Sequence, residues 1–253
     1  MYLPSSLFID DYFHISLYNL MILIFLLILI GIMAYFIRES QKFNHSAELI
    51  QLQDSNKSVI QDNIQSKSPL LIHNLINDDV LSTMTFQSIV DDNPGYIIKD
   101  NDKNISLSIF NDDKIKQTYV IENQNMIKDL ELYNPLNNIC NTFSNELTCN
   151  LKIKLNLFKG DHKVTIQKNK HNSLLITQLF GDTIFYIINP KHNDIVAKSH
   201  DEIKKWAIKI ILKKGLNLYI PPEWYYIYEV NGESIFVNSY SDNYFTFLYN
   251  YLR

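Results

Sequence analysis

The sequence has 253 residues, a formal net charge of −4 at pH 7 and 20% charged residues. This length is enough for one well-packed domain together with an anchor and a linker. Because the chain has neither a basic surplus nor a dense run of Lys and Arg, we expect no nucleic-acid partner.

The composition is biased towards residues with AT-rich codons. Asn, Ile, Lys, Tyr and Asp are abundant, whereas only 6 residues are Gly. This bias is typical of an AT-rich genome, such as that of a large DNA virus, and it makes Asn-based motifs frequent by chance. The glycosylation sequons at Asn44, Asn56 and Asn104 are therefore weak evidence for a glycosylated protein.

An apolar segment near the N-terminus predicts a membrane-spanning helix. Residues 15–37 contain no charged side chain, and their length is close to the ~20 residues that cross the hydrocarbon core of a bilayer. A cleavable signal peptide fits less well, because Asp10 and Asp11 precede the segment in place of a positive region. We expect a short tail outside the membrane over residues 1–14 and an uncleaved transmembrane helix over 15–37, with the lipid bilayer as a partner.

The charges that flank this segment predict its orientation. No Lys or Arg precedes it, whereas Arg38 and Lys42 follow it closely. Since positive residues are enriched on the cytoplasmic side of a membrane, we expect a single-pass protein with its C-terminal domain in the cytoplasm. A virion membrane is the alternative location.

The composition changes again after the membrane segment. Residues 38–66 are rich in Gln, Asn, Ser, Asp and Lys and predict a polar stalk or linker. Globular character begins with the apolar run at 69–72, so residues 67–253 are assigned to one domain. Within that domain, residues 78–150 mix short helical and strand patterns without clear boundaries.

The two cysteines, Cys140 and Cys149, do not have the spacing of a zinc site. We expect free thiols. One local disulfide is the alternative if the domain faces an oxidising compartment.

Beyond residue 150, short apolar runs predict a series of strands. Apolar and polar residues alternate over 151–157, as in a half-buried strand. The runs 173–178 and 183–188 flank the tripeptide Phe-Gly-Asp, which predicts two strands paired through a tight turn. A short helix followed by a strand is expected over 201–214. Three more strands are expected over 218–220, 225–230 and 234–239.

The chain ends in an aromatic segment over residues 240–251. It is expected to pack on the domain as a terminal helix, and a partner-binding surface is the alternative. Many short strands after a region of helices predict a β-rich α+β domain, either a barrel or a sandwich with flanking helices.

Three stretches within residues 68–240 carry a family resemblance. The first is SPLLIHNLI over 68–76, in which a Pro is followed by aliphatic residues and a short polar turn. The segment TIQKNKHNSLLITQLFG over 165–181 ends in Gln-x-x-Gly, and KGLNLYIPPEW over 214–224 contains an Ile-Pro-x-x-Trp turn. In this order, and with residues 234–238 as a closing strand, they resemble the cupin-like, Jumonji-type (JmjC-like) family of Fe(II)- and 2-oxoglutarate-dependent oxygenases. The resemblance implies a cupin-like double-stranded β-helix, or jelly roll, with flanking helices.

The resemblance also implies where the metal ligands of such an enzyme would lie. The family holds Fe(II) with two His and one carboxylate. The first His and the carboxylate correspond to Lys168 and Lys170, and the second His corresponds to Tyr226. The Lys that often binds 2-oxoglutarate corresponds to Thr183. Because an ammonium group has no lone pair to donate, the resemblance implies a degenerate site with no metal and no co-substrate.

Other family positions are retained and are expected to serve packing and turns. They are Gln178, Gly181, Pro221, Trp224 and Asn238. A one-residue slip of the alignment would bring His171 into the ligand set, although a surface or loop role is the simpler interpretation of the histidines in this region.

These observations predict a membrane-anchored, catalytically inactive oxygenase homologue that acts as a binding or scaffold module for a protein or peptide partner. Lys168 and Lys170 in an empty cupin pocket would favour an anionic ligand. One alternative is an active 2-oxoglutarate-dependent protein hydroxylase or demethylase with Fe(II) in an unconventional site. The other is a structural membrane protein of a virion. Fold alone does not choose among them.

Overall fold

The structure is a computed structural model that describes residues 7–44, 48–53, 56–100, 103–110, 119–144, 146–195 and 197–252. The chain divides into two compact units, Met1–Gln41 and Lys42–Arg253.

The first unit is built on one helix, α1 (Leu7–Gln41). Its segment Tyr18–Glu39 has a mean hydropathy of 3.1 and is long and apolar enough to span a membrane. None of this segment is buried within the structure, so it is not the core helix of a folded domain. Of the tail expected over residues 1–14, residues 1–6 lie outside the described part of the chain, and the rest belongs to α1.

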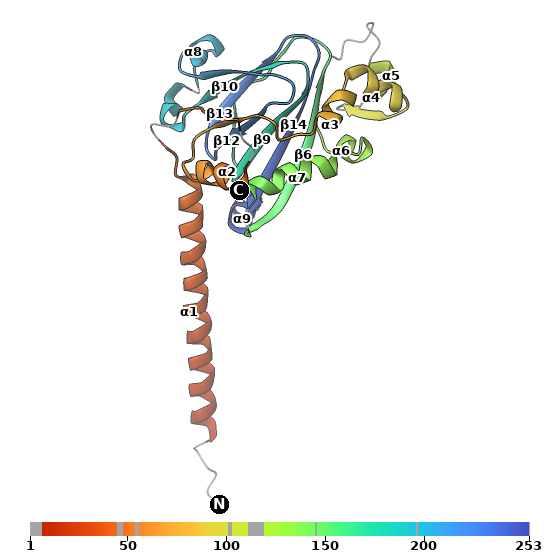
Figure 1. Ribbon diagram of the computed structural model, residues 1–253. Coiled ribbons are helices and arrows are strands. Elements are labelled where there is room, and N and C mark those ends of the chain that lie inside the picture. Colours follow the sequence, from red (N-terminus) through yellow and green to blue (C-terminus); the bar gives the residue numbers. More distant parts are fainter. Residues whose placement is uncertain are drawn as a thin grey trace, which may run out of the picture. The chain divides into compact units, whose positions relative to one another are not determined.

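The second unit contains two main β-sheets and a small hairpin (Figure 1). The seven-stranded sheet has the order β1 (Ile50–Leu52), β2 (Leu70–Ile72), β12 (Asn217–Ile220), β9 (Ser173–Phe180), β14 (Ser234–Asn243), β6 (Thr148–Phe158) and β5 (Tyr119–Asn123). The five-stranded sheet has the order β11 (Ile208–Leu212), β10 (Thr183–Ile188), β13 (Tyr225–Val230) and β7 (His162–Lys163), with β8 (Gln167–Lys168) also paired to β13. The hairpin consists of β3 (Ile97–Asp100) and β4 (Lys103–Ser106).

From β6 onward the chain moves between these two sheets. It enters the seven-stranded sheet with β6, β9, β12 and β14, and the five-stranded sheet with β7, β8, β10, β11 and β13. Every described pair of strands is antiparallel except β1 with β2. The domain is therefore β-rich and mixed α+β, as the sequence predicts.

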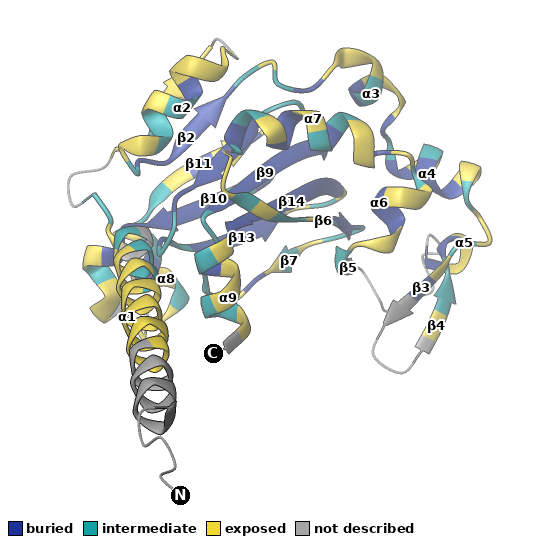
Figure 2. Cartoon of the chain, turned by 90° about the horizontal axis from the view of Figure 1, so that it is seen from below, coloured by how far each residue is buried: buried dark blue, intermediate teal, exposed yellow. Residues whose placement is uncertain are grey.

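Helices cover the face of the seven-stranded sheet that points away from the smaller sheet, and in Figure 2 the strands beneath them are mostly buried. Helices α2 (Lys57–Gln65), α6 (Asn125–Asp129) and α7 (Tyr133–Phe143) form this cover, and α3 (Asp78–Thr83) follows β2. Helices α4 (Phe86–Asp92) and α5 (Leu107–Phe110) lie at the side of the domain, next to the β3–β4 hairpin. On the far side of the smaller sheet lie the 3-10 segment η1 (Pro190–Ile195) and α8 (His200–Lys204), and α9 (Tyr244–Leu252) follows β14.

The apolar residues of the alternating pattern in β6 face the helices. Ile153, Leu155 and Leu157 are buried in the core between the seven-stranded sheet and the helices. Phe158 instead belongs to the core between the two sheets. Because side chains alternate along a strand, the even-numbered residues of β6, including the polar Lys154 and Asn156, point towards the space between the sheets.

Residues 50–65, expected to form part of a polar stalk, instead belong to the domain. β1 pairs with β2, and the side chain of Ile60 in α2 is fully buried. The side chain of Asn56 caps α2 by accepting a hydrogen bond from the Ser58 backbone amide at 3.0 Å. A few apolar residues in a polar segment are enough to cover the edge of a sheet, so the compact unit begins at Lys42 and not at residue 67.

The strands expected at 173–178 and 183–188 exist, but they do not pair with each other. β9 pairs with β12 and β14, whereas β10 pairs with β11 and β13. The turn at Gly181 and Asp182 therefore carries the chain from one sheet to the other, and the predicted hairpin is wrong. Strands were also expected near β6, β11, β12, β13 and β14, and a helix near α8, and all of these are present.

Both cysteines are free thiols, as expected, with Cys140 buried and Cys149 exposed. Burial raises the pKa of the Cys140 thiol to about 11. The aromatic segment after residue 240 ends in a terminal helix, α9, as expected.

Candidate functional site

The first two positions that correspond to metal ligands lie outside the core between the sheets. Lys168 is opposite Tyr225 in the β8–β13 pair, and its Nζ lies 2.5 Å from Glu223 Oε2. The same ammonium is 5.4 Å from the centre of the Tyr225 ring. Lys170 is exposed, and its carbonyl oxygen accepts a hydrogen bond from Asn250 Nδ2. The structure therefore does not place the two lysines in one interior pocket for an anion, because one pairs with a carboxylate and the other is exposed.

The third position, Tyr226, points into the core between the sheets. Its side chain is 3% exposed, and its hydroxyl lies near that of Tyr240. Burial raises the pKa of the Tyr226 hydroxyl above its usual value, so the group is protonated and neutral at physiological pH. A neutral phenol thus occupies the position that corresponds to the second His.

The co-substrate position, Thr183, takes part in a buried chain of hydrogen bonds. Its Oγ1 lies 2.8 Å from Ser234 Oγ, which accepts a hydrogen bond from Gln178 Nε2 at 2.7 Å. Gln178 Nε2 also donates to the Phe180 carbonyl at 2.8 Å. These bonds link β9, β10 and β14 around the turn at Gly181. In this structure Thr183 and Gln178 hold a turn together.

One residue that the sequence analysis missed, Asn169, organises the turn after β12. It is 1% exposed, and its Nδ2 donates to the carbonyl oxygens of Ile220 and Pro221 at 2.8 and 3.0 Å. Its backbone amide donates to the Trp224 carbonyl at 2.9 Å, and its carbonyl accepts from the Glu223 amide at 2.8 Å. Glu223 adopts a positive φ of 69° in this turn. Asn169 therefore fixes the Pro-Pro-Glu-Trp turn from between the two lysines.

A network of phenolic and charged groups surrounds Tyr226. The Tyr240 hydroxyl donates to Glu122 Oε1 at 2.7 Å and accepts a hydrogen bond from Asn238 Nδ2 at 3.1 Å. Lys154 Nζ lies 2.6 Å from Glu122 Oε2. These contacts connect Lys154, Glu122 and Tyr240 across strands β5, β6 and β14, and Tyr226 of β13 in the facing sheet lies beside them.

An unusual backbone conformation aims Glu122 at this network. Glu122 has a positive φ of 56°, and the register of the β5–β6 pair shifts at this point. Its backbone amide donates to Asn156 Oδ1 at 3.0 Å, and the fully buried Asn156 donates through Nδ2 to the Phe236 carbonyl at 3.4 Å. Such a conformation costs about 1–3 kcal/mol in a residue other than Gly, so it persists only where surrounding contacts hold it. Bulges of this kind redirect a side chain, here the Glu122 carboxylate.

The surroundings of Glu122 favour its ionised form. Burial works against ionisation, but hydrogen bonds from Lys154 and Tyr240 and the charges of Lys154 and His171 outweigh it. The pKa of the Glu122 carboxyl therefore lies below its usual value. A lowered pKa in the folded state means that Glu122 stabilises the fold above its unfolded pKa, and that this stabilisation is lost as the pH falls through the folded pKa.

We expect Glu122→Gln to lower the free energy of unfolding by about 1 kcal/mol at pH 7, a value that allows for solvent screening of a carboxylate that is 36% exposed. The difference from the native chain should shrink on acidification to about pH 3, because the native carboxyl is then increasingly protonated. Urea unfolding of the full-length protein in mild detergent at both pH values measures it. Glu146→Gln, at an exposed carboxylate, is the control and should have little effect at either pH. A Glu122→Gln effect that is independent of pH would contradict the assignment.

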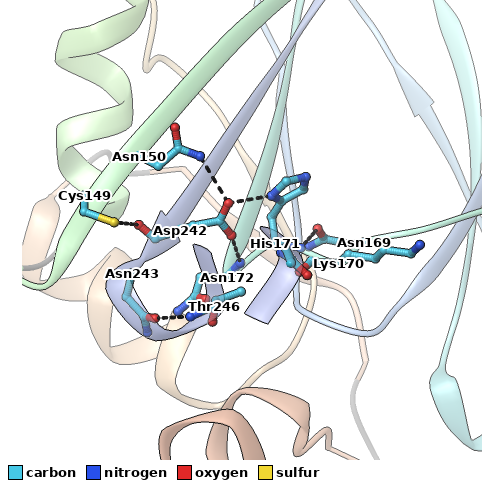
Figure 3. Close-up of polar contacts among 10 residues, drawn as sticks. Cys149, Asn150, Asn169, Lys170, His171, Asn172, Asp242, Asn243 and Thr246 are labelled. Carbon is cyan, nitrogen blue, oxygen red and sulfur yellow. Dashed lines mark hydrogen bonds and ion pairs between the residues drawn. The ribbon is translucent and has the colours of Figure 1, made fainter. Parts of the chain in front are cut away.

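A second polar group, centred on Asp242, continues this network (Figure 3). The Asp242 side chain is 2% exposed, and one of its oxygens lies 2.8 Å from His171 Nδ1. The same carboxylate accepts hydrogen bonds from the Asn172 amide at 3.3 Å and from Asn150 Nδ2 at 3.4 Å. The His171 ring packs on Tyr240 with 4.7 Å between ring centres. Asp242 thus orients His171 beside the phenolic network.

A carboxylate at Nδ1 is the arrangement that prepares a His to act as a general base for a nucleophile. Cys149 is the nearby thiol, but its Sγ lies 3.7 Å from the backbone carbonyl of Asp242, to which it donates. Desolvation and the charge of Asp242 raise the pKa of Cys149, which disfavours the thiolate. The described residues therefore do not assemble a Cys-His-Asp nucleophile here.

Other acidic residues near histidines do not form a metal site either. The sequence contains a His-x-Asp pair at His192 and Asp194 and a His-x-Glu pair at His200 and Glu202. The His192 ring packs on the Trp206 ring, and His200 Nε2 lies 3.3 Å from a Glu229 oxygen. Within the described ranges, no group of three or more His, Cys, Asp or Glu side chains could hold a metal ion.

Two surface hollows lie along α7, on the helical side of the domain. One, of about 810 Å³, is lined by residues of α2 and of the C-terminal end of α7, and the other, of about 530 Å³, by residues around α3 and α7. Neither is lined by the residues of the Glu122 or Asp242 networks.

No protein-family model matches the chain, and no curated protein matches it either. The function has therefore to be inferred from the chain's own residues. Of these, Glu122, Tyr240 and Asp242 were not singled out from the sequence, because their roles depend on contacts between segments far apart in the chain.

Proposed function

We propose that this chain is a single-pass membrane protein whose C-terminal unit is a cupin-like jelly roll without oxygenase chemistry, serving as a binding or scaffold module. The order of the strands supports a jelly roll. If β7 and β8 are counted as one interrupted strand, eight strands are divided equally between the sheets, with neighbours β12-β9-β14-β6 in one and β11-β10-β13-β7/β8 in the other. Successive strands lie in different sheets except β10 and β11, which pair with each other. Two interleaved Greek keys of this kind characterise jelly rolls, including cupins.

The lack of convergence among the three ligand positions carries the proposal. Lys168 is paired with Glu223, Lys170 is exposed, and only Tyr226 faces the core between the sheets. An Fe(II) centre needs two His and a carboxylate on one face of the metal. In place of metal ligands, the buried Tyr226 lies beside the Tyr240–Glu122 pair, which supports a structural role for Tyr226.

The core between the sheets supports the same conclusion, because its middle is filled by aromatic rings. Phe158, Phe185, Tyr228 and Phe236 are each at most 2% exposed and pack on one another, with neighbouring ring centres 5.2–6.0 Å apart. An open cupin pocket for a small anion, as expected from the sequence, does not fit this packing. The binding surfaces of the proposed module therefore lie on the outside of the domain.

The membrane anchor is the second part of the proposal. The apolar segment of α1 supports a bilayer as partner, and Arg38 and Lys42 on its C-terminal side support a cytoplasmic domain. A structural protein of a virion membrane would share the same anchor. Localisation in purified particles would separate that alternative from a host-membrane scaffold.

The decisive measurement is iron content. We expect full-length protein in mild detergent, loaded anaerobically with Fe(II) and 2-oxoglutarate, to retain no stoichiometric iron and to release no succinate. The triple variant Lys168→His, Lys170→Asp, Tyr226→His is expected to behave in the same way, because Lys168 and Lys170 lie outside the core. Retention of native secondary structure, checked by circular dichroism, controls for misfolding.

The two chains together separate the remaining interpretations. Iron binding with succinate release by the native chain would overturn the proposal in favour of an oxygenase with unconventional ligands. Iron binding by the triple variant alone would show that the three positions do converge, contrary to the geometry described above.

A further inference from the structure

The C-terminal helix α9 exposes an apolar stripe. Its residues with exposed side chains are Tyr244 (62%), Phe247 (41%), Leu248 (38%) and Tyr251 (78%). Their spacing of i, i+3, i+4 and i+7 places them on one face of the helix. Single exposed apolar residues are ordinary on protein surfaces, but four on one short helix form a continuous patch.

The opposite face of α9 holds the helix to the domain through polar contacts. Thr246 is 5% exposed, and its backbone amide donates to Asn243 Oδ1 at 2.8 Å, which caps the start of the helix. Asn250 Nδ2 donates to the Lys170 carbonyl at 2.9 Å. Thr246 and Asn250 thus face the protein together with the half-buried Phe245 and Tyr249, whereas the four exposed apolar side chains point away from it.

We propose that this stripe of α9, defined by Tyr244, Phe247, Leu248 and Tyr251, lies in the interfacial region of the lipid bilayer. The helix contains no charged residue between its first and last positions, and two of the four exposed side chains are tyrosines. Tyr combines an apolar ring with a polar hydroxyl, which suits the level of the lipid head groups. Phe and Leu between the tyrosines would enter the acyl boundary, as in interfacial helices.

The membrane anchor makes a bilayer the favoured occupant, so this inference rests on the anchoring part of the proposed function. When one part of a chain is fixed in a bilayer, contact by another part becomes intramolecular, and a weak surface affinity is sufficient. A second copy of the chain is a poorer occupant. A helix of 9 residues is about 14 Å long and 10 Å wide, which falls well short of the roughly 800 Å² per partner in a stable protein interface.

Spin labelling of the full-length chain in phosphatidylcholine nanodiscs tests the proposal. The exposed Cys149 is replaced by Ser, and a nitroxide is attached at Phe247→Cys, or at Tyr251→Cys should the first variant misfold. We expect several-fold more frequent collisions with oxygen, which concentrates in lipid, and fewer with a water-soluble nickel chelate, than at a control label. The matched control is Ile109→Cys on α5, a residue that is 51% exposed.

The outcomes distinguish the candidate occupants. Equal accessibility of the α9 and Ile109 labels to the nickel chelate would overturn the proposal. Protection accompanied by spin–spin broadening, which disappears when unlabelled chain is added, would overturn it in favour of a second copy. A further label at Leu26→Cys, in the apolar segment of α1, reports separately on the anchor. Access of the nickel chelate to the Leu26 label would show that α1 does not span the bilayer. If the Leu26 label is in lipid but the α9 label is exposed to water, only the proposed contact of α9 with the bilayer is rejected.

Discussion

Replacing Gly181 with Ala is expected to lower the free energy of unfolding by about 3 kcal/mol or more. Gly181 has a φ of 65°, a conformation that disfavours any residue with a Cβ, and a Cβ there would overlap the carbonyl oxygen of Glu233. The overlap involves backbone, which cannot rotate away as the end of a side chain can. The turn after β9 would have to separate from the turn before β14.

Substitutions at two other glycines distinguish the cost of the steric overlap at Gly181 from the cost of its positive φ. Gly232 also has a positive φ, of 87°, but a Cβ there meets nothing within 4 Å, so Gly232→Ala should cost only about 1 kcal/mol. Gly95→Ala, with open space around it, should be close to neutral. Urea unfolding of the full-length protein in mild detergent, followed by tryptophan fluorescence, measures all three. If Gly181→Ala lowers the free energy of unfolding no more than Gly232→Ala does, the two turns do not approach each other as closely as described.

The Gly181 turn also shows what a sequence pattern predicts and what it leaves open. Apolar runs located β9 and β10 well, because burial on both sides of a strand leaves a continuous apolar signal. The short connection between them predicted a hairpin, since strands joined by a tight turn usually pair. A pattern of apolar residues does not show whether the second strand stays in the same sheet. Here Gly181 allows a sharp turn against Glu233, and β10 pairs instead with β11 and β13.

The segment before residue 67 differs from the predicted stalk for another physical reason. Average polarity predicts a stalk, yet Ile60 of α2 is fully buried, and β1 extends the seven-stranded sheet by pairing with β2. A short edge element needs only one or two apolar contacts and the backbone hydrogen bonds of its neighbour. An average composition over many residues does not reveal one or two such apolar contacts.

The candidate site was predictable only in part. Tyr226 faces the core between the sheets, but Lys168 lies outside that core because it is opposite Tyr225 in the β8–β13 pair. Glu122 had no signal in the sequence. Its place beside Tyr240 depends on a positive φ and on the buried Asn156, two features that arise only when β5 meets β6.

The second large effect is expected at Phe236, in the middle of the core between the sheets. Phe236→Ala should lower the free energy of unfolding by about 3–5 kcal/mol, because it removes a fully buried ring and leaves a cavity. The ring stacks on Phe158 with 5.6 Å between centres and meets Tyr228 edge-on at 5.2 Å. The same urea unfolding measures the loss. Ile109→Ala, at a side chain on α5 that is 51% exposed, is the control and should change stability by less than about 0.5 kcal/mol.

The Phe236 variant also tests whether the interior is a pocket. A cavity lined by Phe158, Phe185 and Tyr228 is apolar, so benzene should raise the melting temperature of Phe236→Ala and leave that of the native chain unchanged. Stabilisation of the native chain by benzene, or a loss below about 1 kcal/mol in the variant, would mean that the space between the sheets is already open. The space between the sheets would then again be a candidate binding site. The expected result instead leaves the aromatic rings as a permanent filling of the core between the sheets, so we expect any binding site of this domain to lie on its outer surface.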